Sequence, residues 1–330
     1  MKKKINILIL GGTGFIGRNL IEKFEKNKNY NVFSTYFKSK LSKKLKSLNV
    51  NFIKTDLTNK LQVNKILKNK DIVIQAAAVT TGINDVVNKP YIHVTDNAVM
   101  NSIILRSAFE NNIKHLIFFS CTTMYPNVKF PVKEKDFKYN ITEKYFGVGW
   151  TKVYIEKMCE FYSKISNTKF TVIRHSNIYG PHDKYDLIRS HVFGATISKV
   201  MFSEKNFFEV WGDGQERRDL LHVSDLVNFV EIIIKKQTEK FELINVGLGK
   251  TISVRDLVKK IVKLSNKNLK ILYNKNKPTI KFNLALNINY AKEKYKWKPK
   301  IKLDEGILNT IKWYKKNIFK NKKNIIMQKD

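Results

Sequence analysis

Short apolar runs alternate with amphipathic stretches along the first half of the chain. The runs are rich in β-branched residues and long enough to be buried strands, and the stretches between them have the apolar spacing of helices with one buried face. Strands are predicted at residues 5–10, 31–36, 50–54, 71–75, 115–120 and 170–174, and helices at 18–24, 61–67, 97–110 and 153–164. This order predicts an α/β fold of Rossmann type, a doubly wound parallel sheet with ligands at the carboxyl ends of its strands.

A glycine-rich turn joins the first predicted strand to the first predicted helix. Gly11, Gly14 and Gly17 stand in this turn, with Phe15 and Ile16 between them. Glycines let the backbone approach a pyrophosphate, and the free N–H groups at a helix start attract its charge. A glycine turn in some other α/β fold is the alternative. Because a strand precedes the turn and a helix follows it, we expect these five residues to bind a dinucleotide.

The regular alternation of strand-like and helix-like stretches becomes less distinct after residue 180. Helical spacing returns at residues 190–201 and 223–235, and strand-like runs occupy 207–211 and 241–247. We expect the last strand to return to the first sheet. The chain is therefore predicted to have a dinucleotide-binding domain at residues 1–178 and, interleaved with it, a smaller substrate-binding lobe at 179–330, with the substrate between them.

The end of the second predicted strand bears on the choice of dinucleotide. Folds that bind NAD usually carry an acidic residue there, whereas residues 34–38 read Ser-Thr-Tyr-Phe-Lys. Hydroxyl groups and Lys38 suit a 2′-phosphate, so we expect NADP as the cofactor, with NAD as the alternative. Asp56 and Leu57 follow the third strand and are expected beside the adenine, although Asp56 is equally suited to cap a helix.

The composition is strongly basic, with 62 Lys and Arg against 28 Asp and Glu and a net charge of +34. Nucleic-acid binding is one explanation. However, only seven basic residues are arginines, and the 55 lysines are spread along the whole chain, whereas base readers and phosphate clamps favour clustered arginines. We attribute the charge to compositional bias and predict no nucleic-acid partner.

Two cysteines, Cys121 and Cys159, fit a reducing cytoplasm and offer no metal cluster. No apolar run reaches the length of a membrane span. The lysines at 2–4 and the run at 5–10 imitate a signal peptide, but the run lacks a cleavage site and leads straight into the glycine turn. We therefore predict a cytoplasmic protein with no metal and no membrane association.

Further motifs follow the later strands. The small residues Ala76, Ala77 and Ala78 come after the fourth strand, where a cofactor can lie close to the backbone, and hydroxyl side chains come after the fifth. Lys152 precedes the helix at 153–164, and residues 177–183 read Asn-Ile-Tyr-Gly-Pro-His-Asp. In this order and spacing, over about residues 5–300, the chain resembles the extended short-chain dehydrogenase/reductase family of nucleotide-sugar epimerases, dehydratases and reductases.

Within that family the resemblance is greatest to the GDP-L-fucose synthases. It implies a nucleotide-sugar substrate, GDP-linked, and a homodimer. The stretches that carry the resemblance are 76–78 with Gly82 and Ile83, Asp96-Asn97, Tyr125-Pro126, 179–183, 190–192, 211–214, 218–223, 245–249 and Lys277-Pro278.

The resemblance also implies roles for single residues. Thr122 matches the active-site Ser or Thr that bonds the reacting sugar oxygen, Lys152 matches the catalytic lysine that holds the nicotinamide ribose, and His182 matches the acid of the epimerisation. Arg218 is expected to pair with the diphosphate, which suits its planar fork. The other substrate contacts that it implies are Thr123, Asn177, Lys199, Trp211 and Lys277.

One departure removes the family's proton donor. The family places a tyrosine one helical turn before the lysine, and here that position is Val148, which cannot transfer a proton. Tyr145 is seven residues before Lys152, about 10 Å further along a continuous helix. It reaches the site only if Gly147 and Gly149 break that helix.

Two further departures affect the substrate side of the site. The family's epimerising cysteine aligns with Thr123, a far weaker base, although Cys121 is expected to point to the same side of an extended segment. An expected arginine is replaced by Ser198, next to Lys199. Three histidines are interpreted as structural: His115, His175 and His191.

We therefore expect an epimerase or 4-keto reductase of a GDP-linked deoxyhexose or heptose. A missing proton donor costs about 10²–10⁴-fold in rate unless Thr122, Tyr145, His182 or a water replaces it. The alternative is a degenerate member of the family that binds NADP and a nucleotide sugar without turning it over, because of Val148.

Overall fold

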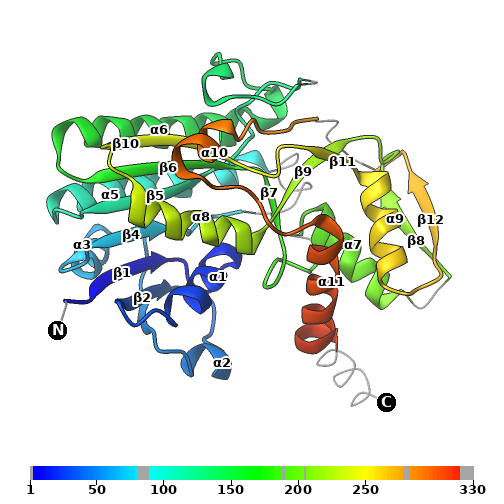
Figure 1. Ribbon diagram of the computed structural model, residues 1–330, viewed down its shortest axis with the longest axis horizontal. Coiled ribbons are helices and arrows are strands. Elements are labelled where there is room, and N and C mark those ends of the chain that lie inside the picture. The colour runs from blue at the N-terminus through cyan, green and yellow to red at the C-terminus, as the bar shows by residue number, and fades with distance from the viewer. Residues whose placement is uncertain are drawn as a thin grey trace.

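A seven-stranded parallel sheet forms the centre of the molecule (Figure 1). The computed structural model describes residues 3–80, 89–128, 130–187, 190–203, 206–277, 279 and 283–319. The strand order is β10-β6-β5-β4-β1-β2-β3, and every neighbouring pair is parallel. Its strands are β1 (Ile5–Leu10), β2 (Tyr30–Tyr36), β3 (Asn51–Lys54), β4 (Ile72–Gln75), β5 (His115–Ser120), β6 (Lys169–His175) and β10 (Phe241–Val246).

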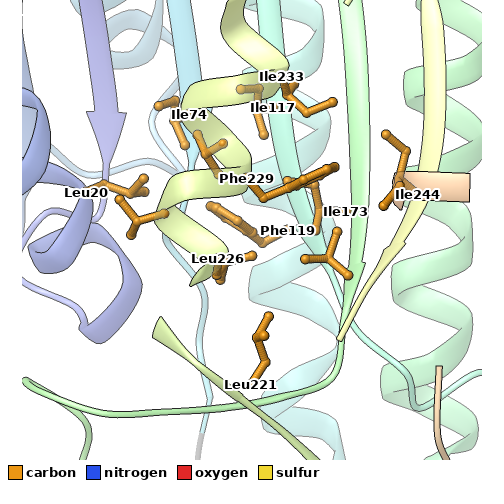
Figure 2. Close-up of a cluster of buried hydrophobic side chains, with 14 of the residues drawn as sticks. Leu20, Ile74, Ile117, Phe119, Ile173, Leu221, Leu226, Phe229, Ile233 and Ile244 are labelled. Atoms are coloured by element: carbon orange, nitrogen blue, oxygen red, sulfur yellow. The ribbon is translucent and has the colours of Figure 1, made fainter. Parts of the chain in front are cut away.

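Helices cover both faces of this sheet, because alternate residues of its strands are apolar on both sides. One face packs against α1 (Phe15–Phe24) and α8 (Val223–Lys236). Figure 2 shows Leu226, Phe229 and Ile233 of α8 over side chains of the central strands, Phe119 among them. The other face packs against α3 (Lys60–Leu67), α5 (Thr95–Glu110) and α6 (Phe146–Ile165).

The direction of winding reverses beside β1. The chain runs outward from β1 through β2 to β3, and then returns to β4 on the other side of β1. The loops that leave β1 and β4 therefore diverge, and such a switch point is where open α/β sheets bind ligands. The glycine turn, residues 11–14, leaves β1 at this point.

The C-terminal part of the chain adds smaller sheets and a third hydrophobic core. One sheet has the order β11-β9-β7 and the other pairs β12 with β8. This core holds Tyr179, Phe193 and Leu257, all almost fully buried. In Figure 1 this region lies to the right of the large sheet. Its elements are β7 (Asn177–Tyr179), α7 (Val192–Phe202), β8 (Phe207–Trp211), β9 (Arg217–His222), β11 (Thr251–Ser253), α9 (Val254–Leu264), β12 (Lys270–Asn274) and α11 (Leu303–Tyr314). Between β12 and α11, α10 (Asn289–Tyr295) returns to the large sheet and packs beside β10.

The prediction of a doubly wound α/β fold is confirmed, and the main correction concerns α6. This helix was expected to begin at 153 but begins at Phe146 and runs unbroken through Gly147 and Gly149. The break at these glycines, the condition set above for Tyr145 to reach the site, does not occur. Gly149 sits where an added Cβ would lie 2.8 Å from the Ile141 side chain, so close packing accounts for a residue that weakens helices. None of the helices in the described part of the chain combines the length and the apolar composition needed to cross a membrane.

Candidate active site at the carboxyl edge of the sheet

The glycine turn forms a cradle that excludes side chains. Gly11 has a φ of +78°, and a Cβ there would lie 2.7 Å from the backbone of Ala77. A Cβ on Gly17 would lie 2.3 Å from the Gly11 carbonyl oxygen. Gly14 is the N-cap of α1, no side chain caps the helix, and its first turn carries no acidic residue. Unsatisfied N–H groups and the positive end of the helix dipole therefore remain for an anion such as a pyrophosphate.

The small residues after β4 lie against this turn. Ala77 is the residue that Gly11 approaches most closely, and its N–H donates to Gln75 Oε1 at 3.1 Å. Ala76 and Ala77 are half-buried and Ala78 is exposed. With Phe15 and Ile16 half-buried on α1, these predicted cofactor-binding residues border one stretch of the carboxyl edge. The structure fits the dinucleotide because added side chains on Gly11 and Gly17 would fill the cradle.

The hydroxyl groups at the end of β2 already make hydrogen bonds within the protein. Ser34 Oγ donates to the Ile9 carbonyl at 2.9 Å, and Thr35 Oγ1 accepts from the Gly11 N–H at 2.9 Å. Both residues are almost fully buried. They therefore support the glycine turn instead of facing a ribose phosphate, as we had expected of them, and Lys38 is left as the candidate for that contact.

Lys38 is exposed and close enough to Asp56 for its charge to act on the Asp56 carboxylate. The Asp56 side chain accepts from the Thr58 hydroxyl at 2.7 Å and from the Thr58 N–H at 2.9 Å. These bonds, with a smaller contribution from Lys38, lower the pKa of Asp56. Asp56 thus shapes a turn before α3, next to the half-buried Leu57.

We predict that Lys38→Ala weakens NADPH binding about tenfold, equal to about 1.4 kcal/mol, and changes NADH binding less than about twofold. The reason is that one exposed cation is removed from the neighbourhood of a 2′-phosphate. Fluorescence titration with both cofactors measures this ratio, and Lys40→Ala, two exposed positions further on, is the control. Equal effects on both cofactors would show that Lys38 does not read the 2′-phosphate.

Lys152 lies on α6 beneath the ends of β5 and β6. Its Nζ donates to the Phe119 carbonyl at 2.9 Å and lies 4.7 Å from the centre of the Phe118 ring. Burial lowers the pKa of Lys152, and the charges of Cys121 and Glu156 oppose that shift. A cation held in a partly desolvated site acts more strongly on neighbouring charge than one in water.

The residues after β5 present a thiol and two hydroxyl groups. Cys121 Sγ lies 2.9 Å from Thr123 Oγ1, so both point to the same side, as expected. Cys121 also interacts electrostatically with Lys152 and Tyr145. Thr122 is half-buried, and its side chain makes no hydrogen bond to the described residues. The thiol is thus close enough to Lys152 for the two groups to interact electrostatically.

Tyr145 reaches this group without a break in α6. It is the N-cap residue of the helix, at the end of a short 3₁₀ turn. Burial raises its pKa, while the charge of Arg218 opposes the shift. Val148, where the family has its tyrosine, is half-buried. Electrostatic interactions therefore link Tyr145 to Cys121 and Arg218, and Cys121 to Lys152, and we refer to these four residues as the cluster.

His182 lies apart from this cluster, beside α1. Its Nε2 is 3.2 Å from Glu22 Oε2 on α1, and its ring meets Trp313 edge-on at 4.7 Å. Burial raises the pKa of Glu22, but the hydrogen bond and charge of His182, with Arg18, outweigh it and lower that pKa to about 2. The positive φ of His182, +69°, is uncommon for a residue with a side chain. No interaction in the described structure joins His182 to Lys152.

The remaining predicted substrate contacts lie in the C-terminal part. The Trp211 ring has Lys199 Nζ at 5.6 Å and Lys277 Nζ at 5.8 Å. Asn177 is exposed and its amide donates to the Asp219 carbonyl at 3.3 Å. Ser198, in place of the expected arginine, is buried and donates to the Tyr185 carbonyl at 2.5 Å. Three of the matched residues lie outside the described residues: Gly82, Ile83 and Pro278.

Two histidines that we expected to be structural approach the cluster. His175 is the last residue of β6 and interacts with Lys152 and with His191. His191 is the N-cap residue of α7 and interacts with Arg218, Lys184 and His93. The sequence signal for His175 was its place directly after a predicted strand, the same signal that singled out the hydroxyl residues after β5.

Comparison with known proteins places the chain among nucleotide-sugar enzymes. The model of the NAD dependent epimerase/dehydratase family matches residues 7–247. A GDP-L-colitose synthase of Yersinia pseudotuberculosis is 28% identical over 94% of this chain and 98% of that protein. A GDP-L-fucose synthase of Azorhizobium caulinodans is 29% identical over 95% and 97%. A UDP-glucuronate 4-epimerase of Thermodesulfobacterium geofontis is 27% identical over 94% and 96%.

Solved structures agree on the fold. A UDP-glucose 4-epimerase of Thermotoga maritima, solved with UDP-glucose, superposes with a TM-score of 0.84 at 26% identity, covering 95% of this chain and 100% of that one. A UDP-glucuronic acid 4-epimerase of Bacillus cereus, solved with UDP-glucuronic acid and NAD, has a TM-score of 0.83 at 23% identity, over 94% and 99%, and shares the fold. Relatives that act on GDP-sugars and on UDP-sugars are thus similar to this chain to nearly the same degree.

Proposed function

Because the chain belongs to the NAD dependent epimerase/dehydratase family, a family of nucleotide-sugar enzymes, we propose that it is an epimerase or 4-keto reductase of a GDP-linked deoxyhexose or heptose. The observation that carries the proposal is the cluster of Lys152, Cys121, Tyr145 and Arg218 at the carboxyl edge of the sheet that carries the glycine cradle. A nicotinamide cofactor supplies a hydride acceptor or donor when bound there.

Each part of the chain has a task in this reaction. Gly11, Gly17 and the start of α1 hold the pyrophosphate of the cofactor, and Lys38 favours NADP over NAD. Lys152 gives up its bond to the Phe119 carbonyl to hold the nicotinamide ribose and lowers the pKa of an acid beside it. Thr122 and the Cys121–Thr123 pair contact the sugar.

The substrate side lies toward the C-terminal lobe, residues 179–330. Arg218 pairs with the diphosphate. Its Nη1 donates to the Arg217 carbonyl at 2.9 Å, and its charge interacts with Tyr145. Trp211, flanked by Lys199 and Lys277, stacks on the base. Two of the relatives described above are named for GDP-sugar products, which supports a GDP-linked substrate. His182 acts as the acid of the epimerisation only if it leaves its contact with Glu22.

An activity assay tests this proposal: purified protein is incubated with NADPH or NAD⁺ and each of a set of nucleotide sugars. The set is GDP-mannose, GDP-4-keto-6-deoxymannose, UDP-glucose and UDP-glucuronate, in deuterated water. We expect a GDP-sugar product, or deuterium at its C3 or C5, by mass spectrometry and NMR. Turnover of the UDP-sugars alone would contradict the GDP assignment, and no turnover or exchange with any of them would contradict the proposal.

Val148 favours a second candidate, a member of the family that binds NADP and a nucleotide sugar without chemistry. Val148→Tyr separates the two. If the site is degenerate, restoring the tyrosine raises turnover by about 10²-fold or more. We expect a gain of less than about tenfold, because other groups carry the proton. Val148→Phe, which adds the ring without the hydroxyl, is the control for packing.

We also propose that the protein forms a homodimer through α5 and α6. Val99, Tyr154, Phe161 and Ile165 are 42%, 51%, 54% and 50% exposed and lie on these two packed helices. Three of them follow the helical repeat along α6, so they form a stripe, and such an apolar patch marks an interaction site.

We predict that Phe161→Glu converts the dimer into the 38.6 kDa monomer, because a charge would be buried at the interface. Sedimentation equilibrium measures the mass. Leu61→Glu, at an 81% exposed position on α3, is the control and leaves the dimer intact. A monomeric wild-type protein would refute the proposed interface.

A further inference from the structure

The missing tyrosine leaves the question of which group carries the proton, and the answer rests on the proposed function. Val148 has no ionisable group. The hydrogen-bond and ring contacts of His182 in the described structure lie with Glu22 and Trp313. We propose that His175 is the proton-transferring residue of this active site.

The position of His175 follows from strand register. Ser120 of β5 pairs with Arg174 of β6, so Cys121 and His175 come directly after that pair on neighbouring strands. His175 also pairs with Val246 of β10. The side chain therefore stands at the carboxyl edge, next to the segment that carries the thiol and the hydroxyl groups.

Phe119 contacts both His175 and Lys152. The His175 ring meets the Phe119 ring edge-on, with 6.2 Å between ring centres, and the Phe119 carbonyl accepts the bond from Lys152 Nζ. His175 and Lys152 interact electrostatically as well. His175 and Lys152 therefore both lie at the carboxyl edge of the sheet, close enough for their charges to interact.

One hydrogen bond fixes the form of the imidazole. His175 Nδ1 lies 2.8 Å from the Ser176 carbonyl oxygen, which can only accept, so Nδ1 carries the proton and Nε2 carries the lone pair. Nε2 makes no hydrogen bond to the described residues, and the ring is half-buried. Burial, with the charges of Lys152 and His191, lowers the pKa of His175 to about 4, so the imidazole is neutral and able to accept a proton.

The proton transfer balances with the hydride transfer. The sugar carbon loses its hydrogen with two electrons to the nicotinamide cofactor, the hydroxyl oxygen loses its proton to His175 Nε2, and the C–O bond becomes a carbonyl. When the carbon regains its hydride within the same catalytic cycle, the imidazolium formed in the first half returns its proton to the oxygen. Lys152 stabilises the negative charge that develops on the reacting sugar oxygen.

Asparagine and alanine substitutions of His175 test this role against a structural one. The amide of the introduced asparagine would still donate to the Ser176 carbonyl, as Nδ1 does, but has nothing at the place of Nε2. We expect His175→Asn to fold and to bind NADPH like the wild type, and to lose about 10²–10⁴-fold in kcat on the substrate found above. Turnover of His175→Ala is expected to rise in proportion to added imidazole.

A His175→Asn variant that keeps kcat within about threefold would overturn the inference while leaving the proposed function standing. If the wild type turns over none of the sugars, ¹⁵N NMR of its histidines tests the role of His175 instead. His175 then has to be the Nδ1–H tautomer, and its Nε2 signal has to shift on saturation with NADP⁺ or NAD⁺. An unchanged signal with bound cofactor, or no binding of either cofactor, would refute it.

Discussion

Lys152→Met will lose about 10³-fold or more in turnover and keep the wild-type fold. The methionine fills the same space but removes the cation that donates to the Phe119 carbonyl at 2.9 Å. Removing a preorganised charge from a site of this kind costs about 10²–10³-fold, and loss of the bond to the nicotinamide ribose adds to that. Steady-state kinetics and NADPH titration on one preparation measure both effects.

Lys157→Met is the matched control for this result. Lys157 is on the same helix but exposed, and its Nζ pairs with Glu160 at 2.9 Å. It should change turnover less than about twofold, because an exposed ion pair contributes about 0–1 kcal/mol. If Lys152→Met kept its activity, the assignment of the active site to this edge of the sheet would be wrong.

Arg174→Met will destabilise the protein by about 3–5 kcal/mol. Arg174 Nη2 lies 2.6 Å from Glu156 Oε2, and both side chains are about 95% buried. Nη1 also donates to the Tyr125 hydroxyl at 2.9 Å, and Tyr125 in turn donates to Asn245 at 2.7 Å. Removal of the guanidinium leaves the Glu156 carboxylate buried, with the Ser120 hydroxyl as its remaining hydrogen-bond partner among the described residues.

The double variant Glu156→Leu/Arg174→Met distinguishes the cost of an unpaired buried charge from the cost of lost side-chain packing. Replacing both charges by apolar groups removes the unpaired carboxylate, so we expect it to recover about 1–4 kcal/mol relative to Arg174→Met. The urea midpoints of the wild type and the two variants measure these differences in unfolding free energy. A double variant no more stable than the single one would mean that the buried charge is not the cause.

The central sheet was predictable because each of its strands is a distinct apolar run. The runs at 5–10 and 115–120 are the observed strands to the residue. The start of α6 was not predictable in this way, since Gly147 and Gly149 weaken a helix locally and only the contact of Gly149 with Ile141 explains its place there. Tertiary packing overrides local propensity at that point.

Residues of the candidate site were predictable where they directly follow a strand, because the strand then determines their position at the edge of the sheet. Cys121 follows directly after β5, and Lys152 was identified by the resemblance to the family. Ser34 and Thr35 could not be placed, because alternation along a strand does not reveal whether a hydroxyl bonds to the neighbouring backbone. His182 could not either, since its positive φ directs the side chain toward α1. The approach of His175 to Lys152 depends on the register of β5 and β6.

A crystal structure of the wild-type protein with NADP⁺ or NAD⁺ tests the central claim, that a dinucleotide lies across this edge with its reactive ring at Lys152. We predict the pyrophosphate on Gly11 and the first turn of α1, and the nicotinamide among Lys152, Cys121 and His175. A dinucleotide bound elsewhere, or with its nicotinamide turned away from Lys152, would contradict the account.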